Sequence, residues 1–529
     1  MMELTATPSL LSLLLAASLV LFGLYRSARP SSSNSKRLPL PPGPPREPIL
    51  GNARHVPSSA PWKVYTEWKK IYGDIVYTRI INQHNIVINS YRVAKEVMDR
   101  AVYSGRYSPV ILDKLMGVNQ GFVSINYGAQ WRIYRRLMNP YMHKVGVGRY
   151  LPMQGKSTCW YLQTLLDHPE EFMENFKLKT AKDITRIVYG ITEEGVIAQY
   201  ISDADHVAKI FLRAILPGSF LVNTIPQLRF LPGWFPGMEF KRIAADGRKI
   251  YLASLNTPVE RVKSKMVRIA PSPDHTNYMT GRPYPMVIKA EGTAEASITS
   301  QLLERGEDED AVKKMNASIY SAAVETTVAS MNSFMLAMTL HPEIVKKAQA
   351  ELDSIVGLSR LPNKDDQERL PYLNAVFMEV LRWMPVVPLG IPHCLLEDDE
   401  YKEYFMPQGS IIHSNTWAMS RDETYYDSPD RFWPERFLKP GEEALDPRLY
   451  VFGLGRRACI GKHLAESSLF LVFASVLATF DIAKVRDKSG REIVPKVDFD
   501  ARVKPFECSI KPRSAVTASL IRDAVAADS

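Results

Sequence analysis

The chain has 529 residues, of which 46% are hydrophobic and 23% charged, and a formal net charge of +9. This composition is typical of a globular protein with a large core and excludes wholesale disorder, while the length alone suggests three or four domains. The positive charge is not gathered into the Lys/Arg runs of a nucleic-acid-binding protein, so we expect an anionic membrane or an acidic protein as partner. The cysteines form no C-x-x-C pair, which argues against a zinc site or a disulfide framework and favours a reducing compartment. They are Cys159, Cys394, Cys459 and Cys508.

The N-terminus contains a predicted membrane anchor. From Leu4 to Tyr25 the chain carries no charge, and this apolar run is long enough to cross a bilayer as a helix. Glu3 precedes the run and basic residues follow it, which predicts that the rest of the chain is cytoplasmic. A cleaved signal peptide, the alternative, would need a basic start and a small-x-small site after a shorter apolar core. We therefore expect residues 1–37 to be an anchor and linker and residues 38–529 to be the main domain.

The next segments predict a small β portion within a mainly helical protein. The proline-rich run Leu38–Pro45 is expected to be a stiff, extended strap. The β-branched runs Ile75–Thr78 and Ile86–Ile88, separated by Asn82–Asn85, predict a β-hairpin. Beyond the hairpin the pattern is overwhelmingly helical. The predicted fold class is therefore mainly α with a small β portion, preceded by one transmembrane helix.

Trp131 and Arg135 stand at positions i and i+4, so they share one face of a predicted helix. By themselves they fit a site for an anionic group and a solvated basic face with one packed tryptophan equally well. Arg132 and Arg136 lie on a neighbouring stripe, from which they could present positive charge to an acidic partner.

Two later segments are irregular. Leu216–Gly237 is apolar but too interrupted by proline and glycine to span a membrane. We expect it to dip into the membrane interface, to roof a hydrophobic pocket, or to be a loop of the core. Pro271–Glu291, with its prolines, glycines and polar residues, is predicted to be a mobile loop.

One long helix is predicted from Lys313 to Leu340, where a His-Pro pair ends it. It carries an acid beside a hydroxyl, Glu325 and Thr326, which together can deliver protons in a dry pocket. Adjacent residues face different directions, so both can serve only if the helix opens locally around water. A bond from Thr326 to the carbonyl one turn earlier would promote this bend. The alternative is an ordinary helix with two solvated threonines.

A further helix is predicted over Pro371–Trp383, in which Glu379 and Arg382 are spaced to pair. Arg436 follows in the segment Phe432–Phe437. We assign these three charged residues a structural role.

The segment Phe452–Gly461 combines Cys459 with three glycines and two arginines, ahead of a run with helical apolar periodicity. The glycines allow a tight turn close to a flat ligand. The helix N-terminus favours the thiolate, which is the form that binds iron, and Arg457 is suited to bind carboxylates.

Two other interpretations of this segment stay open. Gly453–Ala458 also matches the dinucleotide fingerprint G-x-G-x-x-A, with Asp481 as the acidic residue, but this requires a preceding strand and further strand–helix units. The cysteine can also be a buried structural residue in an ordinary turn.

These features together resemble the cytochrome P-450 monooxygenases. The loop matches the family pattern Phe-x-x-Gly-x-Arg-x-Cys-x-Gly, and the order of central helix, Glu-x-x-Arg, Pro-Glu-Arg-Phe and cysteine loop is that of the family. The resemblance implies that Cys459 is the axial ligand of haem b and that Thr326 and Glu325 form the proton relay. Ala323 stands where the family usually has glycine, and its methyl narrows the oxygen pocket slightly. The implied cofactor-binding residues are Trp131, Arg135, Phe452, Arg457, Cys459 and Gly461, and the implied structural lock is Glu379, Arg382 and Arg436.

The resemblance also implies an activity and a location. One atom of dioxygen would enter an apolar substrate and the other would leave as water, with electrons from NADPH through a separate NADPH–cytochrome reductase. The catalytic domain would lie on the cytoplasmic face of the endoplasmic reticulum, held by a single membrane pass. Pro388–His393 and Trp417–Asp422 look most like fungal secondary-metabolism members, which implies a terpenoid, polyketide or indole product. A haem-thiolate isomerase or dehydratase that does not use dioxygen is the alternative.

Three remaining features receive ordinary interpretations. His393 and His413 have no partners at metal-ligand spacing and are interpreted as hydrogen-bonded structural histidines. The tail Pro505–Ser514 resembles the C-terminal hairpin of the family. After Ala515 the chain is expected to be frayed.

Overall fold

The computed structural model describes residues 36–57, 59–269, 287–289, 295–439, 441, 444–497 and 503–528. The predicted anchor Leu4–Tyr25 lies outside these residues, as does most of the predicted loop Pro271–Glu291. At the edges of that loop, Val267–Ile269 (β4) pairs with Val287–Lys289 (β5), so one part of the predicted loop is a strand. Among the helices of the described residues, none has the length and apolarity needed to span a membrane.

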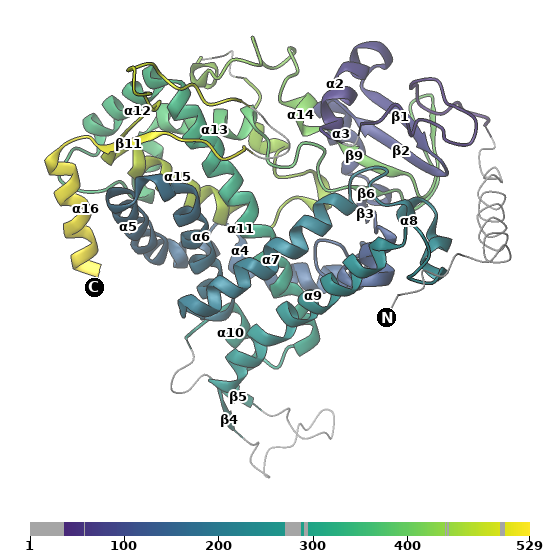
Figure 1. Ribbon diagram of the computed structural model, residues 1–529, viewed down its shortest axis with the longest axis horizontal. Helices are drawn as coiled ribbons and strands as arrows, with labels where there is room; N and C mark the ends of the chain where they lie inside the picture. Colours follow the sequence, from purple (N-terminus) through teal and green to yellow (C-terminus); the bar gives the residue numbers. More distant parts are fainter. Residues whose placement is uncertain are drawn as a thin grey trace, which may run out of the picture.

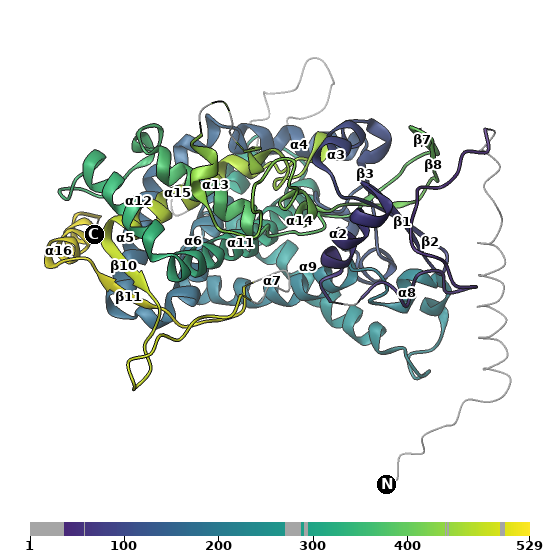
Figure 2. The ribbon, with the colours of Figure 1, turned by 90° about the horizontal axis from the view of Figure 1, so that it is seen from above.

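Helices make up most of the described chain, as the sequence predicts (Figure 1). The long helix α11 runs through the middle of the helical part, in contact with α6 and α15, while α7 and α9 lie side by side along one edge (Figures 1 and 2). The helices are α2 (Pro61–Tyr72), α3 (Tyr91–Met98), α4 (Ala129–Met142), α5 (Leu151–Asp167), α6 (Phe172–Tyr189), α7 (Glu194–Ala214), α8 (Leu221–Thr224), α9 (Glu239–Ser264), α10 (Ile298–Glu304), α11 (Glu309–Leu340), α12 (Pro342–Ile355), α13 (Pro371–Trp383), α14 (Thr416–Met419), α15 (Lys462–Thr479) and α16 (Ala515–Asp528).

The predicted hairpin is confirmed and forms one edge of a five-stranded sheet. Its order is β1-β2-β9-β6-β3, with β9 parallel to β2 and the other pairs antiparallel. The turn is shorter than expected, because residues 83–85 belong to the second strand instead of the connection. The strands of this sheet are β1 (Ile75–Ile80), β2 (Gln83–Ile88), β9 (Ile411–Ser414), β6 (His393–Cys394) and β3 (Gly105–Arg106). Two strands also pair as β7 (Asp399–Tyr401) and β8 (Tyr404–Met406).

Helix α11 begins and ends where its sequence requires. The Asp308 carboxylate accepts the N–H of Ala311 at 2.9 Å and so satisfies a donor of the first turn. Pro342 disfavours the helical conformation of the residue before it, so α11 stops and α12 starts there. The predicted helix from Lys313 to Leu340 is confirmed, with its start about one turn earlier.

Helix α13 has the predicted bounds, and its charged pair is buried. Arg382 donates from Nε and Nη2 to the two Glu379 carboxylate oxygens at 2.7 Å each, and Arg436 Nε lies 3.3 Å from the same carboxylate. The remaining Arg382 donors bind backbone carbonyls, including that of Ser420 at 2.7 Å. The three charged residues are therefore joined to one another and to backbone carbonyls ahead of the cysteine loop, and their role as a structural lock stays a prediction.

The C-terminus differs from the prediction. The expected hairpin is present in part, as Ser509–Pro512 (β11) pairs with Phe480–Ala483 (β10). Residues after Ala515 are helical instead of frayed. Ser514 caps this helix, α16, by accepting the Thr517 N–H at 3.2 Å, and Ile521 is buried against the core. Helices α5 and α15 contact α16, in which Ala518 and Ile521 are buried while Val516 remains 58% exposed.

The segment Leu216–Gly237 belongs to the core in part, which is one of its three predicted roles, and the other two stay predictions. Phe220 and Val222 are buried in an apolar cluster with α7 and α9, whereas Phe230 and Trp234 are 69% and 62% exposed.

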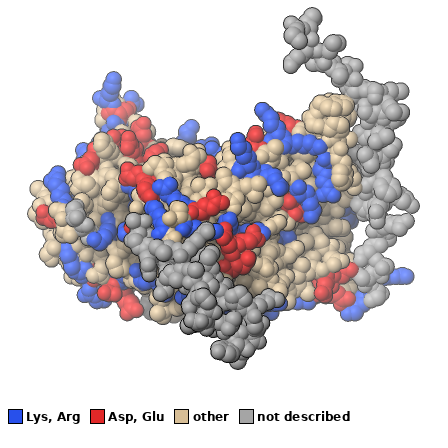
Figure 3. Space-filling view, turned by 90° about the horizontal axis from the view of Figure 1, so that it is seen from below, with Lys and Arg blue, Asp and Glu red and all other residues tan. Residues whose placement is uncertain are grey.

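Figure 3 shows one broad face of the molecule on which acidic and basic side chains are interspersed. A nucleic-acid-binding surface would instead carry a strip of positive charge.

Candidate active site

The cysteine loop is a tight turn that only glycine can complete. The Cys459 N–H donates to the Phe452 carbonyl at 2.7 Å, which closes the loop. Gly453 and Gly455 adopt φ of 77° and 58°. A Cβ at Gly455 would lie 2.2 Å from the Met98 carbonyl oxygen, so both the conformation and the close approach require glycine here.

The Cys459 thiol is accessible to solvent, although protein surrounds its base. Burial raises the pKa of Cys459, and the backbone N–H of Gly461, the Arg135 charge and the N–H of Lys462 act in the opposite direction. The predicted effect of the helix N-terminus is therefore present, but burial outweighs it. A metal ion at the sulfur would supply the missing stabilisation of the thiolate.

The dinucleotide interpretation does not fit this loop. No strand leads into Gly453, and Asp481 lies in β10, whose partner β11 is antiparallel. Asp481 is occupied by Lys346 at 3.0 Å and by the amide of Gln349 at 3.1 Å. The parallel strand–helix series that a nucleotide site needs is missing after this loop in the described residues.

Two buried donors beside the loop have no acceptor among the described residues. Arg457 donates to the carbonyls of Ser104 at 2.9 Å and Ile125 at 2.7 Å, but within this part of the chain its Nη1 has no partner, and neither has Nε1 of buried Trp131. The Arg457 guanidinium carbon lies 4.9 Å from the Trp131 ring centre. Burial lowers the pKa of Arg457 to about 10. Unpaired buried donors with this much positive charge fit a ligand that carries carboxylates, as the propionates of haem do.

Arg135 lies at the same place and also binds the cysteine loop, while its predicted contact with a propionate stays a prediction. Its Nη1 donates to the Ala458 carbonyl at 2.8 Å, so it holds the residue next to Cys459. Its guanidinium carbon also lies 5.9 Å from the Trp131 ring centre. Arg132 and Arg136 are exposed, as predicted.

Two further residues lie beside Arg457 without having been predicted to belong to the site: the cation Arg106 and the histidine His393, which was interpreted as structural. They are directly paired across β3 and β6, and both are buried. Burial, and to a smaller extent the charge of Arg457, lowers the pKa of Arg106 to about 9. Burial, and to a smaller extent the charge of Arg106, lowers the pKa of His393. Neither Arg106 nor Arg457 forms an ion pair with a carboxylate of the described residues. This clustering arises from strand pairing between distant segments, so no local sequence signal revealed it.

The interpretation of His393 and His413 as ordinary hydrogen-bonded histidines holds only for the first. His393 Nδ1 lies 2.6 Å from the Tyr103 carbonyl oxygen. Both ring nitrogens of His413 are buried without a partner in the described residues, and burial lowers its pKa to about 4. His413 is therefore neutral at physiological pH.

The predicted relay residues on α11 face different directions. Thr326 is exposed although the helix around it is largely buried, and its hydroxyl donates to the Ala322 carbonyl at 2.8 Å, as predicted. The helix remains continuous, so the expected local opening is not present. Glu325 is turned towards α6, where Lys177 Nζ lies 3.3 Å from its carboxylate.

The cysteine loop and α11 flank one apolar region. Ile460, next to Cys459, packs against the same hydrophobic cluster as Ala323 and Val328 of α11. The predicted ligand and the predicted hydroxyl therefore come from two elements that border the same apolar cluster.

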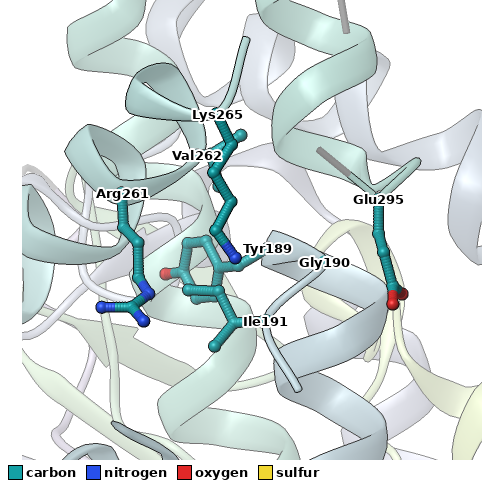
Figure 4. A pocket seen from close by; sticks show the side chains of 7 residues that line it. All are labelled: Tyr189, Gly190, Ile191, Arg261, Val262, Lys265 and Glu295. Atoms are coloured by element: carbon teal, nitrogen blue, oxygen red, sulfur yellow. The ribbon is translucent and has the colours of Figure 1, made fainter. Parts of the chain in front are cut away.

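The described residues also form two hollows. One, of about 280 Å³, lies between α3 and the outer side of the cysteine loop, and its lining includes Lys95, Arg448 and Lys462. The other, shown in Figure 4, lies at the end of α6, and Arg261 and Lys265 border it beside Tyr189. Both of these cations bind Glu193, at 2.9 and 2.8 Å, and they lower the pKa of its carboxyl to about 2. The two cations therefore share one carboxylate partner, while Glu295, which also lines the hollow, pairs with Arg186 at 3.0 Å.

The chain is similar over most of its length to known fungal enzymes. A family model of cytochrome P-450 matches residues 41–246 and 286–508. The cytochrome P-450 monooxygenase claR of Ampulloclitocybe clavipes is 37% identical over 92% of this chain and 89% of its own, and monooxygenase COX1 of Coprinopsis cinerea is 37% identical over 92% and 94%. A zebrafish cytochrome P-450 structure with abiraterone has the same fold, with a TM-score of 0.65, 21% identity, and coverage of 86% of this chain and 100% of that one. The chain belongs to the cytochrome P-450 family of monooxygenases, which bind haem through a cysteine thiolate.

Proposed function

We propose that this protein inserts one oxygen atom from dioxygen into a hydrophobic small molecule in fungal secondary metabolism, with Cys459 as the haem ligand. The reaction is RH + O2 + NADPH + H⁺ → ROH + H2O + NADP⁺. The observation that carries the proposal is the set of unpaired donors, Trp131 Nε1 and Arg457 Nη1, buried beside an accessible Cys459 thiol.

The residues around the loop fit a haem. Cys459 would bind the iron. Arg457 and Arg106, which have no carboxylate partner in the described residues, would face the negatively charged propionates together with Trp131, and the His393 ring would lie beside them. A haem with a thiolate ligand supplies dioxygen activation. Phe452, Gly455 and Gly461 shape the turn, while Arg135 holds it through the Ala458 carbonyl.

Thr326 and Glu325 would divide the delivery of protons. The accessible Thr326 hydroxyl can hold water in the space beside α11, because its own proton is already given to the Ala322 carbonyl and its lone pairs are free to accept. Glu325 faces the opposite side, where Lys177 and Asp205 connect it towards solvent. Protons would therefore enter from the α6 side and reach Thr326 through water or by reorientation of Glu325.

A reductase would dock on the outer side of the cysteine loop. The 280 Å³ hollow there reaches Cys459 and is bordered by Lys95, Arg448 and Lys462, while Arg132 and Arg136 are exposed on α4. This positive surface is suited to an acidic partner such as an NADPH–cytochrome reductase.

The membrane location is part of the same proposal. The apolar run Leu4–Tyr25 would anchor the chain in the endoplasmic reticulum, with residues 38–529 as the cytoplasmic catalytic domain. The exposed Phe230 and Trp234 would rest in the membrane interface. Removal of residues 1–37 should release the protein from membranes at alkaline pH, and retention of the truncated protein in the pellet would show another means of attachment.

The activity is tested in microsomes that contain a reductase and NADPH, with ¹⁸O-labelled dioxygen and a panel of terpenoid, polyketide and indole compounds. We expect a product that gains one labelled oxygen atom and forms only with NADPH. Conversion without NADPH and dioxygen would instead favour the isomerase or dehydratase.

A further inference from the structure

The loop of residues 121–126 directs the two buried arginines of the site. The Val123 carbonyl accepts from Arg106 Nε at 3.0 Å, and the Ile125 carbonyl accepts from Arg457 Nη2 at 2.7 Å. Since neither arginine has a carboxylate partner in the described residues, backbone carbonyls set the direction of each guanidinium. A shift of this loop would turn both groups.

Ser318 on α11 fixes the beginning of the loop. Its Oγ accepts the backbone N–H of Phe122 at 2.9 Å and donates to the Lys314 carbonyl at 2.8 Å. The proton of the hydroxyl is thus used within the helix, and a lone pair is left to bind the loop.

Gly121 brings the loop close enough for this bond. A Cβ at Gly121 would lie 2.6 Å from Ser318 Oγ, so any side chain there would displace the hydroxyl from its present position. The backbone of Gly121 has φ −73° and ψ 156°, a conformation open to every residue, so the effect of a larger residue here would come from this contact and not from backbone strain.

Phe122 transmits this fixed position to Trp131. The two rings are stacked, with centres 5.7 Å apart and planes at 12°. Trp131 is buried, and its Nε1 has no acceptor in the described residues. The stack fixes the plane of the indole ring and with it the direction of the N–H.

We propose that Ser318 is a positioning residue: its hydroxyl seats the loop on the central helix and thereby aims Trp131, Arg106 and Arg457 at the haem propionates. The proposal rests on the haem site of the proposed function and is independent of the substrate class. Ser318 thus connects the residues that would bind the haem propionates to α11, the helix that carries Thr326. It lies outside the family motifs quoted above.

The test uses the full-length, haem-loaded protein. Ser318→Ala leaves the Phe122 N–H without an acceptor, and we expect haem transfer to excess apomyoglobin to become about tenfold faster, the size of effect for one unmade hydrogen bond. The propionate-bending bands in resonance Raman spectra should shift as well, which a loss of general stability would not cause.

Ser321→Ala is the matched control. Ser321 lies on the same helix, and its hydroxyl donates only to α11 carbonyls, at 2.9 Å for Ala317. We expect this variant to keep the haem-transfer rate and the Raman bands of the wild type.

Gly121→Ala provides a second, independent route to the same disturbance. Its Cβ would displace the Ser318 hydroxyl, so the variant should release haem as fast as Ser318→Ala. The double variant should be no worse than either single one, because both act on the same contact.

Wild-type rates and bands in Ser318→Ala, or effects of the same size in Ser321→Ala, would overturn the role of Ser318 and leave the haem site intact. A wild-type protein that binds no haem would overturn the site itself and the proposal with it.

Discussion

Lys177 on α6 lies 3.3 Å from the Glu325 carboxylate on α11 and 2.6 Å from the Asp205 carboxylate on α7. Lys177 and Asp205 are 26% and 29% exposed, whereas Glu325 is 11% exposed. The three groups therefore lead from solvent to the residue next to Thr326. In the proposed function, this arrangement would supply protons to Glu325.

Loss of the Lys177 ammonium should slow the reaction at proton delivery. For Lys177→Met we expect product formation to fall about tenfold or more, with a larger solvent deuterium isotope effect, since the path to Glu325 is broken. Lys182→Met is the control, because Lys182 on the same helix pairs with the exposed Glu194 at 2.6 Å. Equal rates and isotope effects in Lys177→Met and the wild type would exclude this route.

Thr326→Ala should uncouple electron use from product. We expect NADPH to be consumed at a similar rate while the fraction of electrons recovered in product falls about tenfold, because no hydroxyl orients water beside α11. Thr326→Ser should restore most of the coupling. Thr327→Ala removes a hydroxyl that bonds back to the Ala323 carbonyl at 2.7 Å, and it should stay coupled. If Thr326→Ala is as well coupled as Thr327→Ala, Thr326 has no part in the relay.

The buried Glu379 carboxylate should dominate the stability of the segment behind the cysteine loop. Glu379→Gln leaves Arg382 and Arg436 buried without a counter-charge, so we expect the free energy of unfolding to fall by about 3–5 kcal/mol. Glu400→Gln, which breaks an exposed pair with Lys36, should cost at most about 1 kcal/mol. Urea unfolding curves of the two variants distinguish these outcomes, and similar losses in both would contradict the assigned role of Glu379.

Asp366 should contribute stability that depends on pH. Hydrogen bonds from Arg360 at 2.7 Å lower its pKa from 3.8 to about 2. Because the pKa is lower in the folded state than in the unfolded state, this contribution is complete above about pH 4 and disappears as the pH falls through about 2. Asp366→Asn should therefore be less stable than the wild type at about pH 6, and the difference should shrink towards about pH 2. Urea midpoints across this range measure it, and a constant difference would show that ionisation of Asp366 is not involved.

Local sequence patterns predicted those parts of the fold that are determined by interactions between residues close together in the chain. The ends of α13 and the C-terminal end of α11 follow from prolines and helical periodicity, and the hairpin from β-branched runs. The glycine at position 455 was recognised from the loop motif, and the structure shows the close approach to the Met98 carbonyl that requires it.

Features that depend on contacts between distant segments could not be predicted from local sequence patterns. The direction of Glu325 is decided by Lys177 on another helix, and the pairing of Arg106 with His393 joins strands far apart in the chain. The tail after Ala515 is helical because α5 covers it, which its own sequence does not reveal. In each case the deciding partner comes from tertiary packing.

The most direct test of the haem-thiolate assignment is the reduced, carbon-monoxide difference spectrum of the membrane fraction, with Cys459→Ser compared with the wild type and Cys394→Ser as control. Our account predicts a red-shifted Soret band in the wild type and in Cys394→Ser, and its loss in Cys459→Ser, because only Cys459 supplies the thiolate. A red-shifted band that survives in Cys459→Ser, or its absence from folded, haem-supplemented wild-type protein, would contradict the assignment of Cys459 as the ligand.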